Sequence, residues 1–588
     1  MKTFFQRYFF LLDSQAKKQL PLLLLIFISS SFLDIIGIGL VGAFLLLIVN
    51  FSSMLQKLPL SLQYFLNQFN QNHVIFTIGI GLVFAFILKG FWGIYSQKRI
   101  VLFSSQFAVR LKMRLMAGFQ NADYAFHLQQ NSAYLMNKIS QVDNFSNNVL
   151  LASLNMLSSL FIVCSVIACL VSLHPLVTFF LAAMIGLLFL CYEIFVKNDI
   201  VRMGKELATS AGEINKFILQ AMGGLKEIRV LGKENYFRNK LNNVISGYAQ
   251  ALATFNSLQL IPRYAVESAA SIFLVGLVLG ALVIGTSPVN MIPTLGIFAT
   301  ACIRLLPTIS QLISQFSQIR SGAFTTQLIY EEINLLENTY KKNLEAISSS
   351  LIFKSFSLDR VLFRYPNAKQ DALDNINLTL HRGQSIGFMG ASGAGKSTLV
   401  SIFLGLLSPD AGQLLVDGFT INNLREWLNN FAYIPQAIFL LDDTLKRNIA
   451  LGTEDCDIDN QKLQEAIAMA QLSEVVSELP NGADTLIGEN GVRLSGGQRQ
   501  RVALARALYY EREIIIMDEA TSALDNETER EVINSIKKLH GVKTLIVVAH
   551  RLTTLQYCDV VYKLEKGRII AQGSFDDVVR KQEVVDVH

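Results

Sequence analysis

The stretch GASGAGKST, residues 390–398, combines the residue types that bind phosphate groups. It fits the pattern G-x-x-x-x-G-K-[ST] and lies between the strand-like SIGFM and the helix-like LVSIFLGLL. Glycines let backbone N–H groups surround phosphates at the start of a helix, and a neighbouring ammonium group adds positive charge. The spacing therefore predicts a nucleotide phosphate site formed by Gly390, Ala391, Ser392, Gly393, Ala394, Gly395, Lys396, Ser397 and Thr398.

Two acidic residues follow the apolar run IIIM, residues 514–517. Asp518 at the end of this predicted strand can hold Mg²⁺, and Glu519 is placed to polarise an attacking water molecule. In the phosphate loop, the pattern assigns Lys396 to the β and γ phosphates and the Ser397 hydroxyl to Mg²⁺. The two motifs together indicate ATP hydrolysis that requires Mg²⁺.

Between these motifs stands LSGGQRQR, residues 494–501. It supplies a serine hydroxyl and free N–H groups at the positive end of a predicted helix, which is a second place for an anion. Together with the flanking motifs, this segment resembles the signature of the ABC ATPase family. The signature residues are Ser495, Gly496, Gly497 and Gln498.

The resemblance implies roles for further residues. Tyr365 in FRYP is similar to the aromatic that stacks on adenine, and Gln436 in YIPQ to the glutamine that contacts Mg²⁺ and senses the transport domain. Asp525 in SALD matches the D-loop, and His550 in VVAHR matches the histidine that contacts the γ-phosphate. In this family the signature of one subunit closes on the phosphate loop of the other, so two copies of this chain would form two complete sites. The resemblance implies a homodimer.

The elements that position these residues divide into two halves. With 51% hydrophobic and 16% charged residues, the chain is too apolar for an ordinary soluble protein. We expect a helical, polytopic membrane domain over residues 1–325, a linker over 326–350 and an α/β nucleotide-binding domain over 351–588, the layout of an ABC exporter half-transporter. The N-terminal apolar run continues to about Val49 and is typical of a membrane helix rather than a signal peptide. Five more spans lie near 73–97, 147–172, 176–197, 258–284 and 291–318.

The loops between the spans predict the orientation. Lys and Arg concentrate in 98–146 and 198–257, so these segments and both ends of the chain are expected in the cytoplasm. Both segments have helical periodicity, which predicts membrane helices that continue into the cytoplasm and turn near Tyr124–Gln129 and Lys216–Gly224. Segment 51–72 has an apolar stripe and is expected to form a short helix outside.

Several function classes fit poorly. A net charge of +5 on 588 residues, without a clustered basic face, argues against nucleic-acid binding. The six cysteines have no spacing typical of zinc or a disulfide framework. Six spans exclude the soluble ABC ATPases, and two complete hydrolytic sites disfavour a gated channel.

Three basic residues, Lys89, Arg263 and Arg304, lie inside predicted spans. A cation at the centre of a membrane helix costs about 2.5–3.5 kcal/mol, so such residues are interpreted as functional. The helical rise places all three toward the cytoplasmic half of the bilayer, where they could bind an anionic substrate. Alternatively, Lys89 and Arg263 reach the interface by snorkelling, and Arg263 pairs with Glu267 four residues later.

A narrower resemblance concerns the substrate. A set of features is together similar to the lipid-linked oligosaccharide flippases of bacterial glycosylation: Asp34 in the first span, the external apolar segment 51–72, Lys89 in the second span, PRYAVE in the fifth and RLLP in the sixth. That resemblance implies the inner membrane and a pyrophosphate-linked glycan as substrate, although exporters of other envelope lipids share parts of the pattern. Asp34 could instead neutralise a basic residue. The alternative is a peptide or drug exporter, and the absence of a protease domain before helix 1 counts against those that cleave leader peptides.

Overall fold

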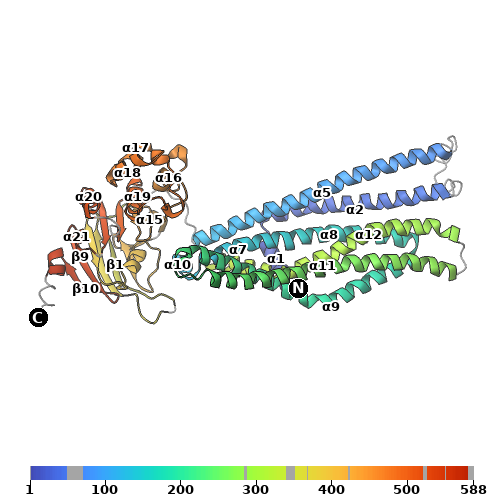
Figure 1. The fold of residues 1–588 in the computed structure, drawn as a ribbon, viewed down its shortest axis with the longest axis horizontal. Helices are drawn as coiled ribbons and strands as arrows, with labels where there is room; N and C mark the ends of the chain where they lie inside the picture. Colours follow the sequence, from blue (N-terminus) through green and yellow to red (C-terminus); the bar gives the residue numbers. More distant parts are fainter. Residues whose placement is uncertain are drawn as a thin grey trace. The chain divides into compact units, whose positions relative to one another are not determined.

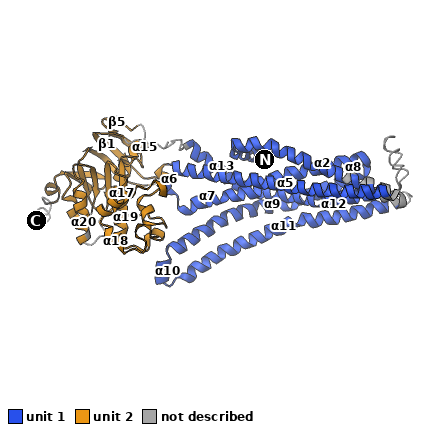
Figure 2. Ribbon diagram, turned by 90° about the horizontal axis from the view of Figure 1, so that it is seen from above, with its two compact units in different colours: residues 1–122, 127–341 blue, residues 123–126, 342–588 orange. Residues whose placement is uncertain are grey.

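A computed structural model describes residues 2–49, 71–283, 288–339, 351–366, 368–421, 424–520, 526–549 and 551–580. The chain forms two compact units, one of residues 1–122 and 127–341 and the other of residues 123–126 and 342–588 (Figure 2). The expected linker 326–350 begins inside a helix of the first unit, and its residues 340–350 lie outside the described ranges. Most of the expected external helix 51–72 also lies outside them.

The first unit is helical throughout its described length (Figure 1). Its helices are α1 (Lys2–Leu11), α2 (Ser14–Val49), α5 (Gln71–Asn121), α7 (Ser132–Phe145), α8 (Leu151–Leu173), α9 (Pro175–Gly223), α10 (Leu225–Val230), α11 (Glu234–Val283), α12 (Pro288–Ser321) and α13 (Ala323–Thr339). A π-helical turn at Ser146–Leu150 joins α7 to α8 without a break.

Six of the described helices are long and apolar enough to cross a membrane, which confirms the expected polytopic domain. Three of them, α5, α9 and α11, contain 51, 49 and 50 residues. At about 1.5 Å per residue they are roughly 75 Å long, whereas the hydrocarbon core is about 30 Å thick. These helices therefore continue beyond the bilayer, as their periodicity predicts.

Short turns join the long helices where the sequence places helix breakers and caps. Gly224 ends α9, and the Asn131 side chain accepts a hydrogen bond from the Tyr134 N–H at the start of α7. Helix α6 (Tyr124–Gln129) stands at the first of the two expected turns. Its residues 124–126 are grouped with the second unit.

Helix α12 packs against α2, α8, α9 and α11, and so occupies the centre of the first unit. Its buried side chains, among them Phe298, Leu305 and Ile309, join an apolar core shared with α8, α9 and α11. The backbones of α9 and α12 approach closely at Gly204, where an added Cβ would lie 2.3 Å from the carbonyl oxygen of Ser321. Only glycine permits this contact, so Gly204 fixes α9 against α12.

The second unit combines two sheets with short helices (Figure 1). The strands are β1 (Ser355–Phe363), β2 (Leu373–His381), β3 (Ser385–Met389), β4 (Ala411–Val416), β5 (Phe419–Thr420), β6 (Phe431–Ile434), β7 (Ile514–Asp518), β8 (Thr544–Val548), β9 (Val560–Glu565) and β10 (Arg568–Gly573). The helices are α14 (Lys396–Phe403), α15 (Leu424–Leu428), α16 (Leu445–Ile449), α17 (Asn460–Met469), α18 (Ser473–Glu478), α19 (Gly496–Tyr509), α20 (Asn526–Lys537) and α21 (Leu552–Leu555).

The larger sheet has the order β10-β9-β3-β8-β7-β6 and is parallel except for the edge strand β10. Strands β7 and β8 are buried along their whole length, as expected for the interior of a parallel sheet. In the register, Phe388 of β3 and Asp518 of β7 both pair with Val548 of β8. The segments that leave β3, β7 and β8 therefore begin at one edge of the sheet, which brings the phosphate loop and the Asp518 motif together.

Candidate functional site

The phosphate loop leaves β3 with a backbone that requires glycine. Gly390 has φ +154° and Gly395 has φ +103°. An added Cβ would lie 2.3 Å from the Leu564 carbonyl oxygen at Gly390 and 2.6 Å from the Ala372 carbonyl oxygen at Gly395. Helix α14 starts directly after Gly395, so its first N–H groups are presented at the end of this loop. The loop thus has the backbone geometry of an anion cradle.

Lys396 lies within the curve of the same loop. Its ammonium donates hydrogen bonds to the carbonyl oxygens of Gly390 at 2.7 Å and Ala391 at 3.0 Å. Burial lowers the pKa of Lys396, while the charges of Glu519 and Asp518 act in the opposite direction. A cation is therefore held among loop carbonyls and near two carboxylates, where a phosphate could replace the carbonyl contacts.

Glu519 follows β7 and occupies a left-handed backbone conformation with φ +53°. Its N–H donates to the Val548 carbonyl oxygen at 2.9 Å, which fixes the turn to β8. Its carboxylate accepts a hydrogen bond of 2.6 Å from the side-chain amide of Gln436. The glutamine that follows β6 and the glutamate that follows β7 thus form one polar pair, and a non-glycine residue at positive φ is typical of functional positions.

Asp518 is almost fully buried, with 4% of its surface exposed. The Tyr433 hydroxyl of β6 donates to its carboxylate at 3.4 Å. Desolvation of this hydroxyl and the neighbouring Asp518 charge raise the pKa of Tyr433 above its ordinary value. Tyr433 was not among the residues predicted from the sequence. Its position three residues before Gln436, in the adjoining strand, was the available signal.

Tyr365, expected to stack on adenine, is half-buried beside the phosphate loop. Its hydroxyl is 3.0 Å from the Thr398 hydroxyl of α14, and its ring lies edge-on to Phe363 with centroids 5.0 Å apart. These contacts attach the expected base-binding residue to the phosphate-binding helix.

The signature segment begins helix α19. Ser495 is its N-cap: the side chain accepts from the Gln498 N–H, and the Gln498 side chain accepts from the Ser495 N–H at 2.8 Å. This capping box orients the first turn of a 14-residue helix, in which Gly496 and Gly497 leave the N-terminal N–H groups uncovered by side chains.

Asp525 and His550 lie outside the described residues, so their predicted roles rest on the sequence motif. The residues predicted to hold Mg²⁺ are Ser397, Gln436 and Asp518, and they offer a hydroxyl, an amide and a buried carboxylate. This oxygen set suits Mg²⁺, which is commonly bound through one or two carboxylates together with phosphates and water. Over the described ranges, no three His, Cys, Asp or Glu side chains form a metal site by themselves.

The first unit contains a cluster of charges between α2, α5 and α12. Asp34 is fully buried, and its carboxylate lies 2.6 Å from the ammonium of Lys89 and 2.7 Å from the guanidinium of Arg304. Asp34 thus neutralises part of the basic pair, the alternative that the sequence left open. The three side chains together carry one net positive charge.

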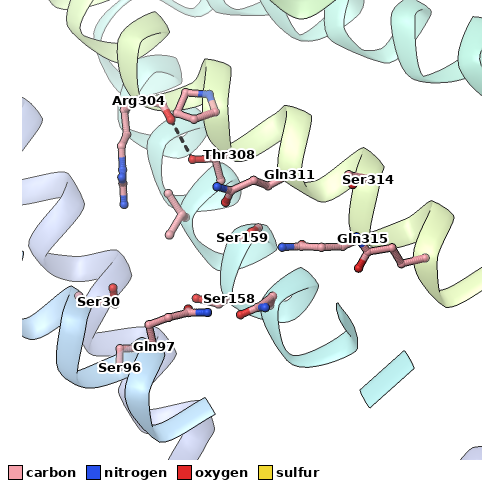
Figure 3. Close-up of a pocket in the computed structure, with 15 residues that line it drawn as sticks. Ser30, Ser96, Gln97, Ser158, Ser159, Arg304, Thr308, Gln311, Ser314 and Gln315 are labelled. Carbon is pink, nitrogen blue, oxygen red and sulfur yellow. Dashed lines mark hydrogen bonds between the residues drawn. The ribbon is translucent and has the colours of Figure 1, made fainter. Parts of the chain in front are cut away.

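Next to this cluster is a cavity of about 490 Å³ (Figure 3). Arg304 and polar side chains of α2, α5, α8 and α12 converge on it. The Thr308 hydroxyl donates a hydrogen bond of 2.8 Å to the carbonyl oxygen of Arg304. The lining residues are Ser30, Gly93, Ser96, Gln97, Asn155, Ser158, Ser159, Ile162, Arg304, Pro307, Thr308, Gln311, Ser314, Gln315 and Gln318.

Arg263 lies apart from the Asp34 cluster. It lines a second cavity of about 450 Å³ together with Glu267, Leu306, Pro307, Ser310 and Gln311. The two cavities share Pro307 and Gln311, so they flank the same turn of α12. The structure thus brings Lys89 and Arg304 together at Asp34, whereas Arg263 belongs to a neighbouring surface.

Family models match both units. Residues 25–306 match the ABC transporter transmembrane region, and residues 373–522 match the ABC transporter model. The chain belongs to the ABC transporter family. Its second unit is accordingly an ABC ATPase domain, and the matched range includes the phosphate loop, Glu519 and the signature segment.

Curated relatives share a common description. The ATP-dependent lipid A-core flippase of Cupriavidus pinatubonensis is 31% identical over 401 residues, which cover 65% of this chain and 65% of that protein. The protein of the same description from Blochmanniella pennsylvanica is 26% identical over 555 residues, which cover 93% of this chain and 94% of that protein. The match to this ABC transporter thus spans about 65% of the length of the Cupriavidus pinatubonensis protein. It spans 94% of the length of the Blochmanniella pennsylvanica protein.

A solved structure shares the whole fold. The structure of a bacterial Atm1-family ABC exporter with ATP bound superposes with a TM-score of 0.75 and 22% sequence identity, and covers 93% of this chain and 95% of that chain. The likeness confirms that six membrane helices followed by an ABC ATPase domain form an exporter fold.

Proposed function

We propose that this ABC transporter is a homodimeric, ATP-driven flippase that moves an amphiphilic substrate outward across a bacterial inner membrane. The substrate is a lipid-linked oligosaccharide or a similar anionic glycolipid. The ATPase domain lies in the cytoplasm. The observation that carries the proposal is the convergence of the phosphate loop, Asp518 and Glu519 at one sheet edge, in a chain whose described part also contains six candidate membrane spans.

At the ATP site, the glycine loop and Lys396 bind the phosphates, and Tyr365 stacks on the adenine. Glu519 orients and polarises the attacking water, and its hydrogen bond to Gln436 holds the carboxylate in position. His550 contacts the γ-phosphate. Ser397, Gln436 and Asp518 would hold Mg²⁺, which supplies charge neutralisation at the phosphates.

Two copies of the chain complete each site. The Ser495 cap and the first turn of α19, with Gly496 and Gly497, present an anion site that meets the γ-phosphate held by the other copy. Since each chain supplies both halves, a homodimer would contain two hydrolytic sites.

The charge distribution of the membrane unit supports an anionic headgroup. Asp34 neutralises one of the two cations at α5 and α12, so one positive charge remains next to the cavity. Charge-assisted hydrogen bonds from Arg304 or Lys89 to a phosphate would offset the cost of holding that charge within the membrane. Arg263 and its cavity would contact another part of the same amphiphile. The curated relatives, which are named as flippases of a lipid, agree with this class of substrate.

Reconstitution tests the proposal. Proteoliposomes containing the protein and a fluorescent polyprenyl pyrophosphate oligosaccharide should move the headgroup to the far leaflet with ATP but not with a non-hydrolysable analogue. Glu519→Gln protein provides the matched control for hydrolysis. Movement of the lipid at the same rate without hydrolysis, or transport of a peptide or apolar drug but not of the lipid, would contradict the proposed function.

A further inference from the structure

We infer that the cavity along α12 binds the sugar part of the substrate through uncharged amide and hydroxyl groups, while the cations at Asp34 bind its phosphate end. This assignment rests on the proposed function and names the part of the substrate that each group of residues recognises. Figure 3 shows the side chains that form the cavity wall.

The wall is polar but nearly uncharged. Arg304 is its one charged lining residue among those described, and the Arg304 guanidinium is already bonded to the buried carboxylate of Asp34. Ile162 and Pro307 are its larger apolar members. The Gln318 amide already donates to the side-chain oxygen of Gln259, but a drug-like apolar molecule would cover the amide of Gln311 without offering it a hydrogen bond, which carries a desolvation cost. A second phosphate within this cavity would meet amides and hydroxyls instead of cations.

Amides and hydroxyls match sugars because both partners donate and accept hydrogen bonds. The cavity volume of about 490 Å³ falls within the range of about 300–1,000 Å³ that is common for ligand pockets.

The polar side chains that α12 contributes to the cavity lie in a row along the helix. Arg304, Thr308, Gln311, Gln315 and Gln318 recur at intervals of three and four residues, so they form a single stripe on α12. Fourteen residue steps of about 1.5 Å give this stripe a length of roughly 21 Å. Asn155, Ser158 and Ser159 supply a facing stripe on α8. An elongated headgroup with its phosphate at Arg304 would therefore extend its sugars past Gln311 toward Gln318.

The cavity is tested with two fluorescent lipids in proteoliposomes. One is a polyprenyl pyrophosphate that carries an oligosaccharide of neutral hexoses and N-acetylhexosamines, and the other is the same polyprenyl pyrophosphate without sugars. In Gln311→Leu/Gln315→Leu protein, we expect KM for the glycosylated lipid to rise roughly ten-fold or more, since each lost hydrogen bond weakens binding by about two- to twelve-fold. KM for the bare lipid should be unchanged.

Matched variants separate this effect from a general loss of an amide. Gln106→Leu removes an exposed amide of α5 outside the cavity and should leave both lipids unaffected. Ser158→Ala removes one cavity hydroxyl without added bulk and provides the test if the double variant does not fold. It should raise KM for the glycosylated lipid alone.

The outcomes are distinguishable. Unchanged KM values, an equal loss for both lipids, or a wild-type protein that does not distinguish them would overturn the sugar assignment and leave the flippase proposal standing. If the wild-type protein moves neither lipid, the proposed function fails and the sugar assignment fails with it.

Discussion

The ATP site of the second unit and the polar cavity of the first position their side chains in different ways. At the ATP site, turns that leave parallel strands hold the groups, and Glu519 and Gly390 adopt backbone conformations that few residues tolerate. In the cavity, ordinary helical backbone carries the groups at repeated spacing on four helices. The first arrangement fixes single atoms for chemistry, whereas the second provides many similar contacts to a larger surface. A single substitution at the ATP site should therefore have a large effect, whereas a single substitution in the cavity should remove only one of many similar contacts.

At the ATP site, the largest effect is expected for Glu519→Gln. The amide is nearly isosteric and can still accept the Gln436 hydrogen bond, but it cannot take up a proton from water. We expect ATP binding to persist and hydrolysis to fall by about 10²–10⁴-fold, the range for positioned acid–base groups. Steady-state ATPase and nucleotide-binding assays on purified protein measure the two effects.

The control is Glu565→Gln, which changes an exposed glutamate at the end of β9. It should hydrolyse ATP at the wild-type rate. A near-normal rate of ATP hydrolysis in Glu519→Gln protein would contradict a catalytic role for Glu519.

The motifs of the ATP site could be predicted because each is a run of consecutive residues whose function depends on local backbone. The cavity could not be predicted in the same way. Asp34 and Arg304 are 270 residues apart in the chain, and the sequence suggests that Asp34 neutralises a basic residue without showing that Lys89 and Arg304 share it. Likewise, the glutamines of α12 have helical spacing, but only the packing of α12 against α2 and α8 places them on a common wall with Ser30 and Ser158.

The charge cluster provides the second-largest expected effect, on stability rather than on catalysis. Asp34→Asn leaves the cations of Lys89 and Arg304 without their buried counter-ion, and removal of one partner from a buried ion pair costs about 3–5 kcal/mol. We expect a lower midpoint of thermal unfolding in detergent. Adding Arg304→Gln to Asp34→Asn should restore much of the loss, because one uncompensated charge is removed.

A surface pair in the same unit provides the comparison. Asp143 and Lys112 form an exposed pair at 2.7 Å, for which about 0–1 kcal/mol is expected. If Asp143→Asn and Asp34→Asn reduce stability equally, the buried cluster has no special structural role.

Helix packing is tested at Gly204. In Gly204→Ala, the new methyl group would meet the Ser321 carbonyl oxygen at 2.3 Å, so α9 and α12 must separate at a cost of about 1–3 kcal/mol. Gly186→Ala in the same helix has no atom within 4 Å and should be neutral or stabilising by up to about 1 kcal/mol. Thermal unfolding of the two variants side by side would detect the difference, and equal midpoints would refute a close contact at Gly204.

The smallest effect is expected at Tyr365. Tyr365→Phe retains the ring but loses the hydrogen bond between the Tyr365 and Thr398 hydroxyls. We expect the free energy of ATP binding to weaken by at most the net contribution of one hydrogen bond, about 0.5–1.5 kcal/mol. Tyr365→Ala also loses the stacking surface and should weaken ATP binding further. Titration with a fluorescent ATP analogue measures both affinities. If the two variants bind equally, adenine does not stack on this ring.

The polar wall of α12 also has a consequence for biosynthesis. Among the six candidate spans, those in α11 and α12 are the least apolar, because they contain Arg263, Arg304 and the amides of the cavity. A cation at the centre of a span costs about 2.5–3.5 kcal/mol at the translocon, so neither helix is a strong insertion signal by itself. The Arg304 charge becomes tolerable once Asp34 of α2 is beside it. Helix α12 therefore depends on helices synthesised much earlier, and we expect it to leave the insertion machinery only after the α2 and α5 pair is in place.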